Sequence, residues 1–110
     1  MPDYKFVIMT NPVEGREDEY NKWYDEQHVA DVIKLPGFTG GQRFDYVDHL
    51  SAEPCPYRYI AIYDITTDDI AATMAGLVNA ADKPHLPISE SMSTDTAAFV
   101  YRARGPYLRA

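Results

Sequence analysis

The sequence predicts an α+β domain with the element order β-α-β-β-α-β, in which a four-stranded antiparallel sheet carries two helices on one face. Four segments rich in β-branched and aromatic residues alternate with two amphipathic helical segments. The length of 110 residues and the hydrophobic content of 45% are those of one ordinary globular domain, residues 1–110. No sequence repeat divides the chain further.

The first half of the chain begins with a strand over residues 4–10 (YKFVIMT), most of whose side chains are β-branched or aromatic. Residues 14–27 are expected to be helical, because acidic residues at their start suit a helix N-terminus. A further helical stretch, residues 28–34, should stop at the following Leu-Pro-Gly. The second strand, residues 38–47, contains Gly40-Gly41, which indicates a bulge or a close backbone approach.

The second half follows a polar loop over residues 48–56 with the strongest strand, residues 57–65 (YRYIAIYDI). The Thr-Thr-Asp-Asp that follows should cap a helix over residues 70–81. A long loop, residues 82–92, precedes the last strand, residues 97–102. This order is the split βαβ, ferredoxin-like arrangement. Because its second sheet face stays apolar, we expect a homodimer in which a second copy covers that face.

The charge balance excludes some classes of partner. With 17 Asp and Glu against 10 Lys and Arg, the net charge is −7, which disfavours binding to nucleic acid phosphates. No apolar run approaches the ~20 residues of a membrane-spanning helix, and no signal peptide is recognisable. Cys55 is the single cysteine, so no internal disulfide forms and a cytoplasmic location is expected. We therefore expect a small-molecule ligand, and neither nucleic acid nor membrane.

The first helix has an unusual inward face. At 100° per residue, one sector of residues 13–31 contains mostly aromatic or polar side chains: Val13, Tyr20, Trp23, Tyr24, Gln27 and Asp31, with His28 at its edge. Buried polar groups cost free energy unless they are paired. The polar half of this sector is therefore either a satisfied structural network or the wall of a polar pocket.

Three side chains of this sector can touch, because Tyr24 and His28 are four residues apart and His28 and Asp31 three. A carboxylate near an imidazole favours its protonated form, and such a histidine is a competent general acid or base near neutral pH. Tyr24 could donate a hydrogen bond to a developing oxyanion. In the alternative interpretation, His28 and Asp31 only cap the break between the two helical stretches, and the sequence leaves both open.

Other candidate binding residues lie on the strands and in the last loop. Tyr57, Tyr59 and Tyr63 share one face of the third strand, either as core packing or as an aromatic pocket, and the sequence leaves open whether they face the helices. Arg43 could bind a substrate carboxylate or enolate. Alternatively, it could pair with one of three aspartates: Asp31, Asp45 or Asp64. His85 lies in a Pro-bounded loop of the kind that can form a lid.

A metal site is not expected. Asp25, His28 and Asp31 have suitable side chains, but Asp25 projects about 60° away from His28 and about 120° from Asp31 on a helical wheel. The chain contains no second cluster of His or Cys.

The first helix and the turn after it resemble the EthD-like branch of the dimeric α+β barrel superfamily. Residues 19–31 (EYNKWYDEQHVAD) match the helix motif of that branch, WYDE.H..D, and residues 35–38 (LPGF) match its PGF turn. Arg43 and Phe44 match the arginine and the aromatic residue of its next strand. The resemblance covers about residues 4–103. It implies a ferredoxin-like monomer, sheet-to-sheet dimerisation into a barrel, and a pocket between the helices and the sheet.

Members of that superfamily include cofactor-independent cyclases, isomerases, dehydratases, small monooxygenases and haem-degrading enzymes. In the EthD-like branch the motif histidine is the usual catalytic candidate, and His28 occupies its position, with Tyr24 and Asp31 at neighbouring motif positions. The monooxygenase and haem-degrading members use Asn, Trp and His from different elements. Here Asn21, Trp23 and His28 lie on one helix and Asn21 should point outward, so this match implies no oxygen or haem chemistry.

We therefore predict a small homodimeric enzyme without a bound cofactor. It would catalyse isomerisation, dehydration, cyclisation or lyase-type cleavage of a carbonyl-bearing aromatic, polyketide-like or lactone-type metabolite. His28 is the predicted general base or acid, Asp31 orients it and Tyr24 stabilises charge. The predicted substrate-binding residues are Arg43, Tyr63, Trp23, Tyr59 and His85. The alternatives are a non-catalytic protein that binds a hydrophobic metabolite, a cofactorless monooxygenase-like enzyme, and a structural dimer.

Overall fold

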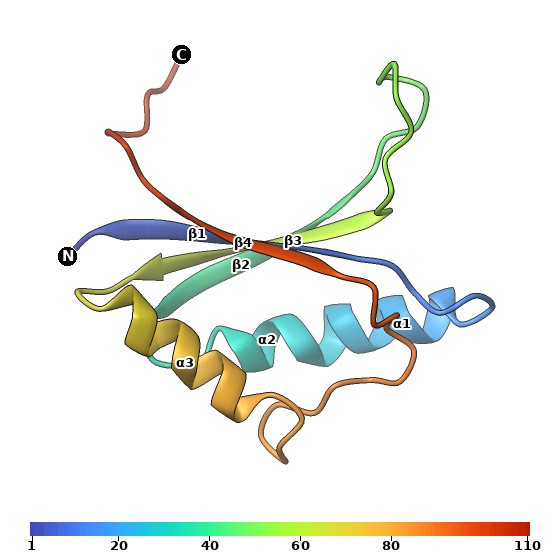
Figure 1. Ribbon diagram of the computed structural model, residues 1–110, viewed down its shortest axis with the longest axis horizontal. Coiled ribbons are helices and arrows are strands. Elements are labelled where there is room, and N and C mark those ends of the chain that lie inside the picture. Colours follow the sequence, from blue (N-terminus) through green and yellow to red (C-terminus); the bar gives the residue numbers. More distant parts are fainter.

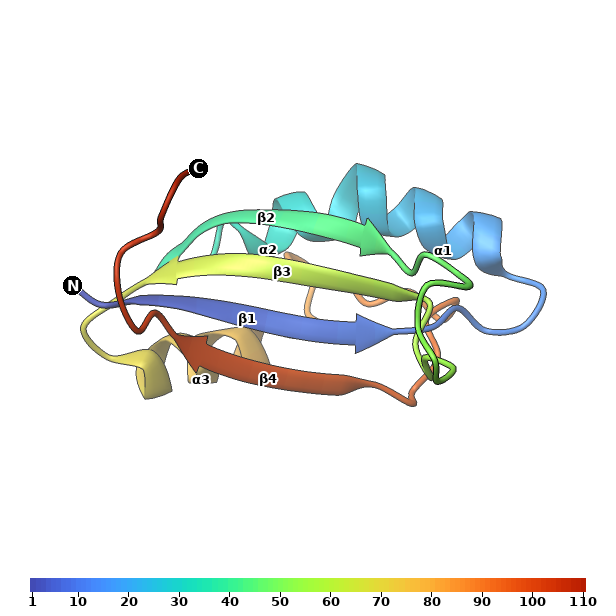
Figure 2. The same cartoon turned by 90° about the horizontal axis from the view of Figure 1, so that it is seen from above.

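The computed structural model describes residues 1–110 and places one layer of helices against one face of a sheet (Figure 1). The four antiparallel strands, in the spatial order β2-β3-β1-β4, are β1 (Asp3–Thr10), β2 (Phe38–Asp45), β3 (Tyr59–Thr66) and β4 (Ala97–Arg102). The helical elements are α1 (Glu17–Trp23), the π-helical turn η1 (Tyr24–His28), α2 (Val29–Val32) and α3 (Ile70–Ala80). Viewed from above, α1 and α3 lie on the same side, behind the sheet (Figure 2). The predicted order and layering are confirmed.

The element boundaries differ from the predicted ones where turns intervene. The first helix begins at Glu17 instead of residue 14, because Gly15 has a positive φ of 82° and the chain turns there. It then continues to Val32 without the expected break after residue 27, since η1 joins α1 to α2. β2 ends two residues early and β3 starts two residues late, which leaves a longer loop between them. Asp69 caps α3 as predicted, its side chain accepting a hydrogen bond from Ala72 N.

Strand register decides which side chains face the helices. Phe6 pairs with Tyr63 and Ile8 with Ala61, and this set points into the core between sheet and helices. The question that the sequence left open is thus resolved, because Tyr63 is 1% exposed on the helix side. The expected bulge lies between Phe38 and Gly40. The close approach is at Gly41, where a Cβ would lie 2.7 Å from the Tyr63 ring.

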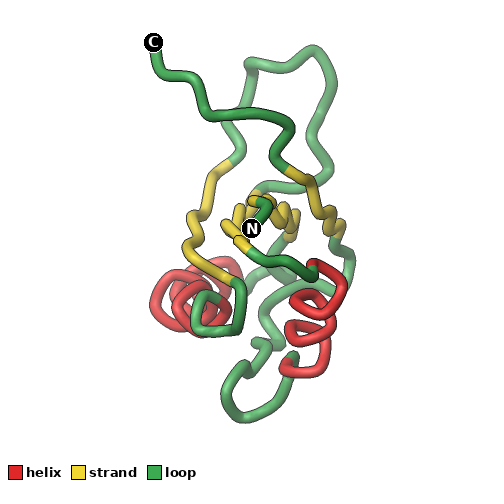
Figure 3. The backbone as a smooth tube through the Cα atoms, turned by 90° about the vertical axis from the view of Figure 1, so that its left-hand side faces the viewer, coloured by secondary structure: helices red, strands yellow, loops and turns green.

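No helix covers the other face of the sheet (Figure 3). The residues that pair across this face are mostly hydrophobic: Val7, Met9, Phe44, Ile60, Ile62 and Phe99. An ion pair between Lys5 and Asp64 lies near one end of it. None of the helices is both long enough and apolar enough to cross a membrane.

Candidate functional site

The π-helical turn η1 sets the direction of the candidate catalytic histidine. A π-turn contains more residues than an α-turn, so the side chains that follow it are rotated relative to an ideal α-helical wheel. His28, placed at the edge of the inward sector by the wheel, is 7% exposed, whereas Gln27, placed inside it, is exposed. The inward position predicted for Gln27 is therefore wrong. Tyr20 and Tyr24, which precede or begin the turn, are buried as predicted.

Two aromatic rings hold the His28 imidazole. The Trp23 ring stacks on it with a centroid separation of 4.5 Å, and the Tyr24 ring meets it edge-on at 5.0 Å. Nδ1 of His28 is buried and has no hydrogen-bond partner. Burial lowers the pKa of His28 to about 4, although Asp31 acts in the opposite direction. The imidazole is therefore neutral at neutral pH, contrary to the expectation that Asp31 favours its protonated form, because the loss of hydration outweighs the carboxylate.

His28 and Tyr63 line an apolar cavity of about 250 Å³ between the helices, the sheet and the loop that follows α3. Every other lining residue is hydrophobic: Phe6, Ile8, Val32, Leu77, Val78, Ala81, Leu86, Ile88 and Met92. The Tyr63 hydroxyl is buried beside the Tyr24 hydroxyl without a well-aligned hydrogen bond, and burial, followed by the neighbouring Tyr24, raises the pKa of Tyr63 above its ordinary value. His28 and Tyr63 are therefore the two side chains with polar atoms in an otherwise apolar cavity wall.

Arg43 lies behind Tyr24 and does not line the cavity. Its guanidinium is 4.4 Å from the centre of the Tyr24 ring and donates hydrogen bonds to Asp25 Oδ1 (2.7 Å) and Asn21 Oδ1 (2.9 Å). None of the three aspartates expected as its partner is used, because α1 and the η1 turn that continues it run beside β2 and bring Asn21 and Asp25 within reach (Figure 2). The outward position predicted for Asn21 is also wrong, since its amide also donates to the Tyr59 hydroxyl (3.2 Å).

Tyr24 is the third predicted catalytic residue on this helix and is packed behind the cavity. Its hydroxyl is buried without a partner, and burial raises the pKa of Tyr24 to about 12. Its ring is 1% exposed and lies between Arg43 and His28. Tyr24 therefore supports the imidazole from one side.

The remaining predicted site residues lie away from the cavity. Asp31 is half-buried and makes no hydrogen bond or ion pair with His28. The Tyr59 hydroxyl donates to Glu17 Oε2 (2.6 Å), and His85 is exposed. Trp23 reaches the site only through its stacking on His28. The catalytic and binding roles of these residues stay predictions.

The sequence analysis missed the contribution of the loop after α3. Leu86 is fully buried, and together with Ile88 and Met92 it closes one side of the cavity. The signal was present, because this Pro-bounded loop carries three large apolar side chains at positions where a solvated loop would be polar. His85, the residue singled out in that loop, is only the neighbour of the residue that closes the cavity.

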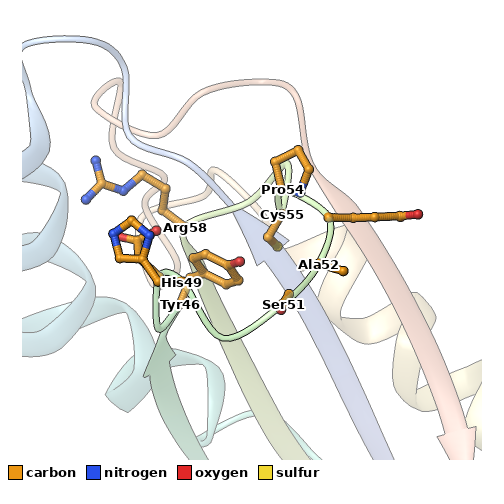
Figure 4. A pocket seen from close by; sticks show the side chains of 9 residues that line it. Tyr46, His49, Ser51, Ala52, Pro54, Cys55 and Arg58 are labelled. Carbon is orange, nitrogen blue, oxygen red and sulfur yellow. The ribbon is translucent and has the colours of Figure 1, made fainter.

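A second hollow lies in the β2–β3 loop, at one end of the sheet (Figure 4). It has a volume of about 480 Å³ and is lined by polar side chains that include Asp48, His49 and Glu53. No predicted site residue lines it. No group of three His, Cys, Asp or Glu side chains anywhere in the chain is close enough to hold a metal ion.

No protein-family model and no curated protein sequence matches the chain. Solved structures do match. The heme-degrader MhuD from Mycobacterium tuberculosis, with two hemes bound, has a TM-score of 0.66 at 19% identity, over 94% of this chain and 98% of MhuD. SnoaB from Streptomyces nogalater, a cofactor-independent oxygenase, has a TM-score of 0.62 at 19% identity, over 94% of this chain and 95% of SnoaB.

An EthD family protein from Bacillus halodurans is similar as well, with a TM-score of 0.54 at 13% identity, over 98% of this chain and all of that one. Identities this low establish a shared fold and leave the reaction open. The ferredoxin-like fold implied by the resemblance to the EthD-like branch is thus confirmed. The chain has the fold of the ferredoxin-like dimeric α+β barrel proteins, among which an EthD family protein is found.

Proposed function

We propose that this protein is a small enzyme that moves a proton on a carbonyl-bearing, hydrophobic metabolite held in the His28 cavity. The observation that carries the proposal is a neutral imidazole with no hydrogen-bond partner in the wall of an apolar cavity that the Tyr63 side chain also lines. A buried polar group without a partner costs free energy, so a ligand whose polar end pairs with the imidazole would recover that cost. The volume of about 250 Å³ is below the ~300–1,000 Å³ of usual ligand pockets, which favours a compact ligand.

The proposed step begins with a C–H bond next to the substrate carbonyl. His28 accepts the proton, and the electron pair of the broken bond moves to the carbonyl oxygen as an enolate. Tyr63 donates a hydrogen bond to that oxygen. With a pKa of about 4, His28 by itself is a weak base, but a neighbouring enolate strongly favours the imidazolium in an apolar site. Isomerisation, dehydration, cyclisation and lyase-type cleavage can each start from this step.

A second candidate is a cofactorless oxygenase-like reaction. It is favoured by the apolar lining, since dioxygen is itself apolar, and by the similarity to SnoaB, a cofactor-independent oxygenase. The first step would be the same proton transfer to His28. The electron pair of the resulting carbanion would then form a C–O bond to dioxygen, and the outer oxygen of the peroxide formed would take back the proton from the His28 imidazolium. Consumption of oxygen during turnover would distinguish this candidate from the proton-transfer reactions.

We also propose that two copies pack with their outer sheet faces together. The apolar side chains of that face, including Phe44 and Phe99 at 39% and 50% exposure, support this arrangement. The free, exposed Cys55 supports a reducing, cytoplasmic environment.

Solvent deuterium exchange tests the proposed chemistry without requiring the natural substrate. A small bicyclic ketone, such as 2-tetralone, is incubated with the protein in D₂O, and loss of the signal from the hydrogens beside the carbonyl is followed by NMR. We expect protein-dependent exchange that falls ~10²–10⁴-fold in His28→Asn, the range for removal of a general base. Binding is followed in parallel through the fluorescence of Trp23, the only tryptophan, which stacks on His28.

One matched variant and one folding measurement serve as controls. Lys34→Gln, an exposed substitution just beyond α2, should leave exchange unchanged, and circular dichroism should show that His28→Asn remains folded. Equal exchange in the wild type and in His28→Asn would contradict the proposal. Ketone binding without exchange would instead support the non-catalytic binding protein.

A further inference from the structure

Two segments leave the sheet on its outer side, away from the helices. The β2–β3 loop (residues 46–58) and the C-terminal arm (residues 103–110) both rise above the apolar face, at opposite ends of the sheet (Figures 1 and 3). Each carries large apolar side chains in solvent: Tyr107 and Leu108 of the arm are 83% exposed and Leu50 of the loop is 81% exposed. Exposed apolar groups that flank an apolar face indicate a surface for another protein chain.

The two segments have opposite charge. The arm contains Arg104 and Arg109 and no acidic side chain, in a chain whose net charge is −7. The loop contains Asp48 and Glu53, and Arg58 is its one Lys or Arg. Arg58 lies 3.6 Å from Glu17 and also lines the hollow, so the two acidic side chains outnumber it there. Because the segments stand at opposite ends of one sheet, this complementarity cannot be satisfied within a single copy (Figure 1).

The loop also offers a receptor of suitable shape. Its side chains surround the hollow of about 480 Å³ (Figure 4). The acidic residues Asp48 and Glu53 are among the residues that line it. Tyr46 and Pro54 add apolar surface to the same hollow. Carboxylates beside apolar surface suit a segment that presents arginine next to tyrosine and leucine, which is the composition of the arm.

We propose that the C-terminal arm of one copy binds the β2–β3 loop of a second copy of this chain. This inference rests on the proposed sheet-to-sheet dimer and selects its symmetry axis. A two-fold axis that exchanges the two ends of the sheet places the arm of each copy beside the loop of the other. The dimer then contains two arm–loop contacts that are equivalent by symmetry. The alternative axis would place arm beside arm and bring four arginines together, which charge repulsion disfavours.

A charge swap tests the proposed pairing. Arg104→Glu with Arg109→Glu, or Asp48→Lys with Glu53→Lys, should each raise the dimer dissociation constant roughly tenfold to a hundredfold, measured by sedimentation equilibrium at low salt. Combining all four substitutions should restore dimerisation. Glu14→Lys with Glu26→Lys makes the same charge change on the helix side and should not weaken the dimer. Failure of the combined variant to recover would overturn the proposal.

Disulfide cross-linking tests whether the arm of one copy lies near the loop of the other, since Cys55 is the only cysteine and lines the hollow. In Leu108→Cys, mild oxidation should give a dimer linked between Cys55 of one copy and the new cysteine of the other, identified by mass spectrometry. The matched control Ala75→Cys, on exposed α3, should not link to Cys55. A linkage between the two introduced cysteines would show that arm meets arm and would overturn the arm–loop pairing.

The same measurements separate the two proposals. If the wild type is a dimer and the arm substitutions leave its dissociation constant unchanged, the arm–loop pairing is wrong and the sheet-to-sheet dimer stands. If the wild type remains a monomer at every concentration, both are wrong. The chemistry at His28 is tested separately by deuterium exchange.

Discussion

Neighbouring residues of β3 face two very different environments. Ala61, Tyr63 and Ile65 are each 1% exposed beneath the helices, whereas Ile60 and Ile62 remain partly exposed on the outer face. The inner face contains several hydroxyl-bearing aromatic rings and the cavity, while the outer face is simpler and more uniformly apolar. The difference indicates that the inner face is specialised for binding and the outer face for assembly, because only the inner one combines enclosure with unpaired polar groups.

The largest effect is expected from placing the same charge on either face of β3. Ala61→Asp buries an unpaired carboxylate and should cost more than about 3 kcal/mol, enough to unfold a domain of this size. Ile62→Asp, one residue away, should leave the monomer folded and raise the dimer dissociation constant at least about a hundredfold. Circular dichroism and sedimentation equilibrium measure the two outcomes. Equal unfolding of both variants would remove the distinction between the faces.

Acid should destabilise the inner face through His28. Its pKa is lowered to about 4 in the folded chain, against about 6.5 in the unfolded chain, so between these values the unfolded chain binds the additional proton. The free energy of unfolding should therefore fall by up to about 3 kcal/mol as the pH drops from about 6.5 to about 4. Urea unfolding across this range measures it. His28→Phe keeps a ring beside Trp23, and its free energy of unfolding should fall less over the same pH range. An identical pH dependence in both proteins would contradict the assignment to His28.

Removing the hydroxyl of Tyr20 should lower the free energy of unfolding by about 1–2 kcal/mol more than removing the hydroxyl of Tyr63. Tyr20 hydrogen-bonds to Thr10 in the core, so Tyr20→Phe leaves the Thr10 hydroxyl unpaired and should destabilise by about that amount. The Tyr63 hydroxyl has no partner, so Tyr63→Phe should be neutral or slightly stabilising while weakening ketone binding. Urea denaturation and Trp23 fluorescence provide the measurements. A destabilised Tyr63→Phe would mean that the hydroxyl is already paired within the folded chain.

The smallest effect is expected at the ion pair of the outer face. Lys5 and Asp64 are both largely solvent-accessible, so Asp64→Asn should change the stability of the monomer by no more than about 1 kcal/mol, and less at high salt. Denaturation under monomeric conditions, at low and high salt, tests this. A larger, salt-insensitive loss would show that the pair is buried and that the outer face is covered.

Much of the fold could be predicted because the relevant signals are local. The Thr-Thr-Asp-Asp segment predicted the cap that Asp69 provides. Gly40-Gly41 predicted a bulge or a close backbone approach, and the structure has both. The site was harder to predict. His28 was identified correctly as an inward-facing candidate, but the helical wheel assumed regular α-helical turns, and η1 moved Gln27 out and His28 in. Contacts between distant elements, such as Arg43 with Asp25, leave no local pattern to read.

The sequence by itself determined the element order, the inward aromatic stripe of the first helix and the apolar character of both sheet faces, because periodicity, caps and turns depend on neighbouring residues. Only the tertiary structure decided that Tyr63 and His28 share a cavity, that Leu86 closes it and that the imidazole is neutral. These properties depend on which segments pack together and how much water they exclude, and desolvation is a collective effect of every element around the histidine.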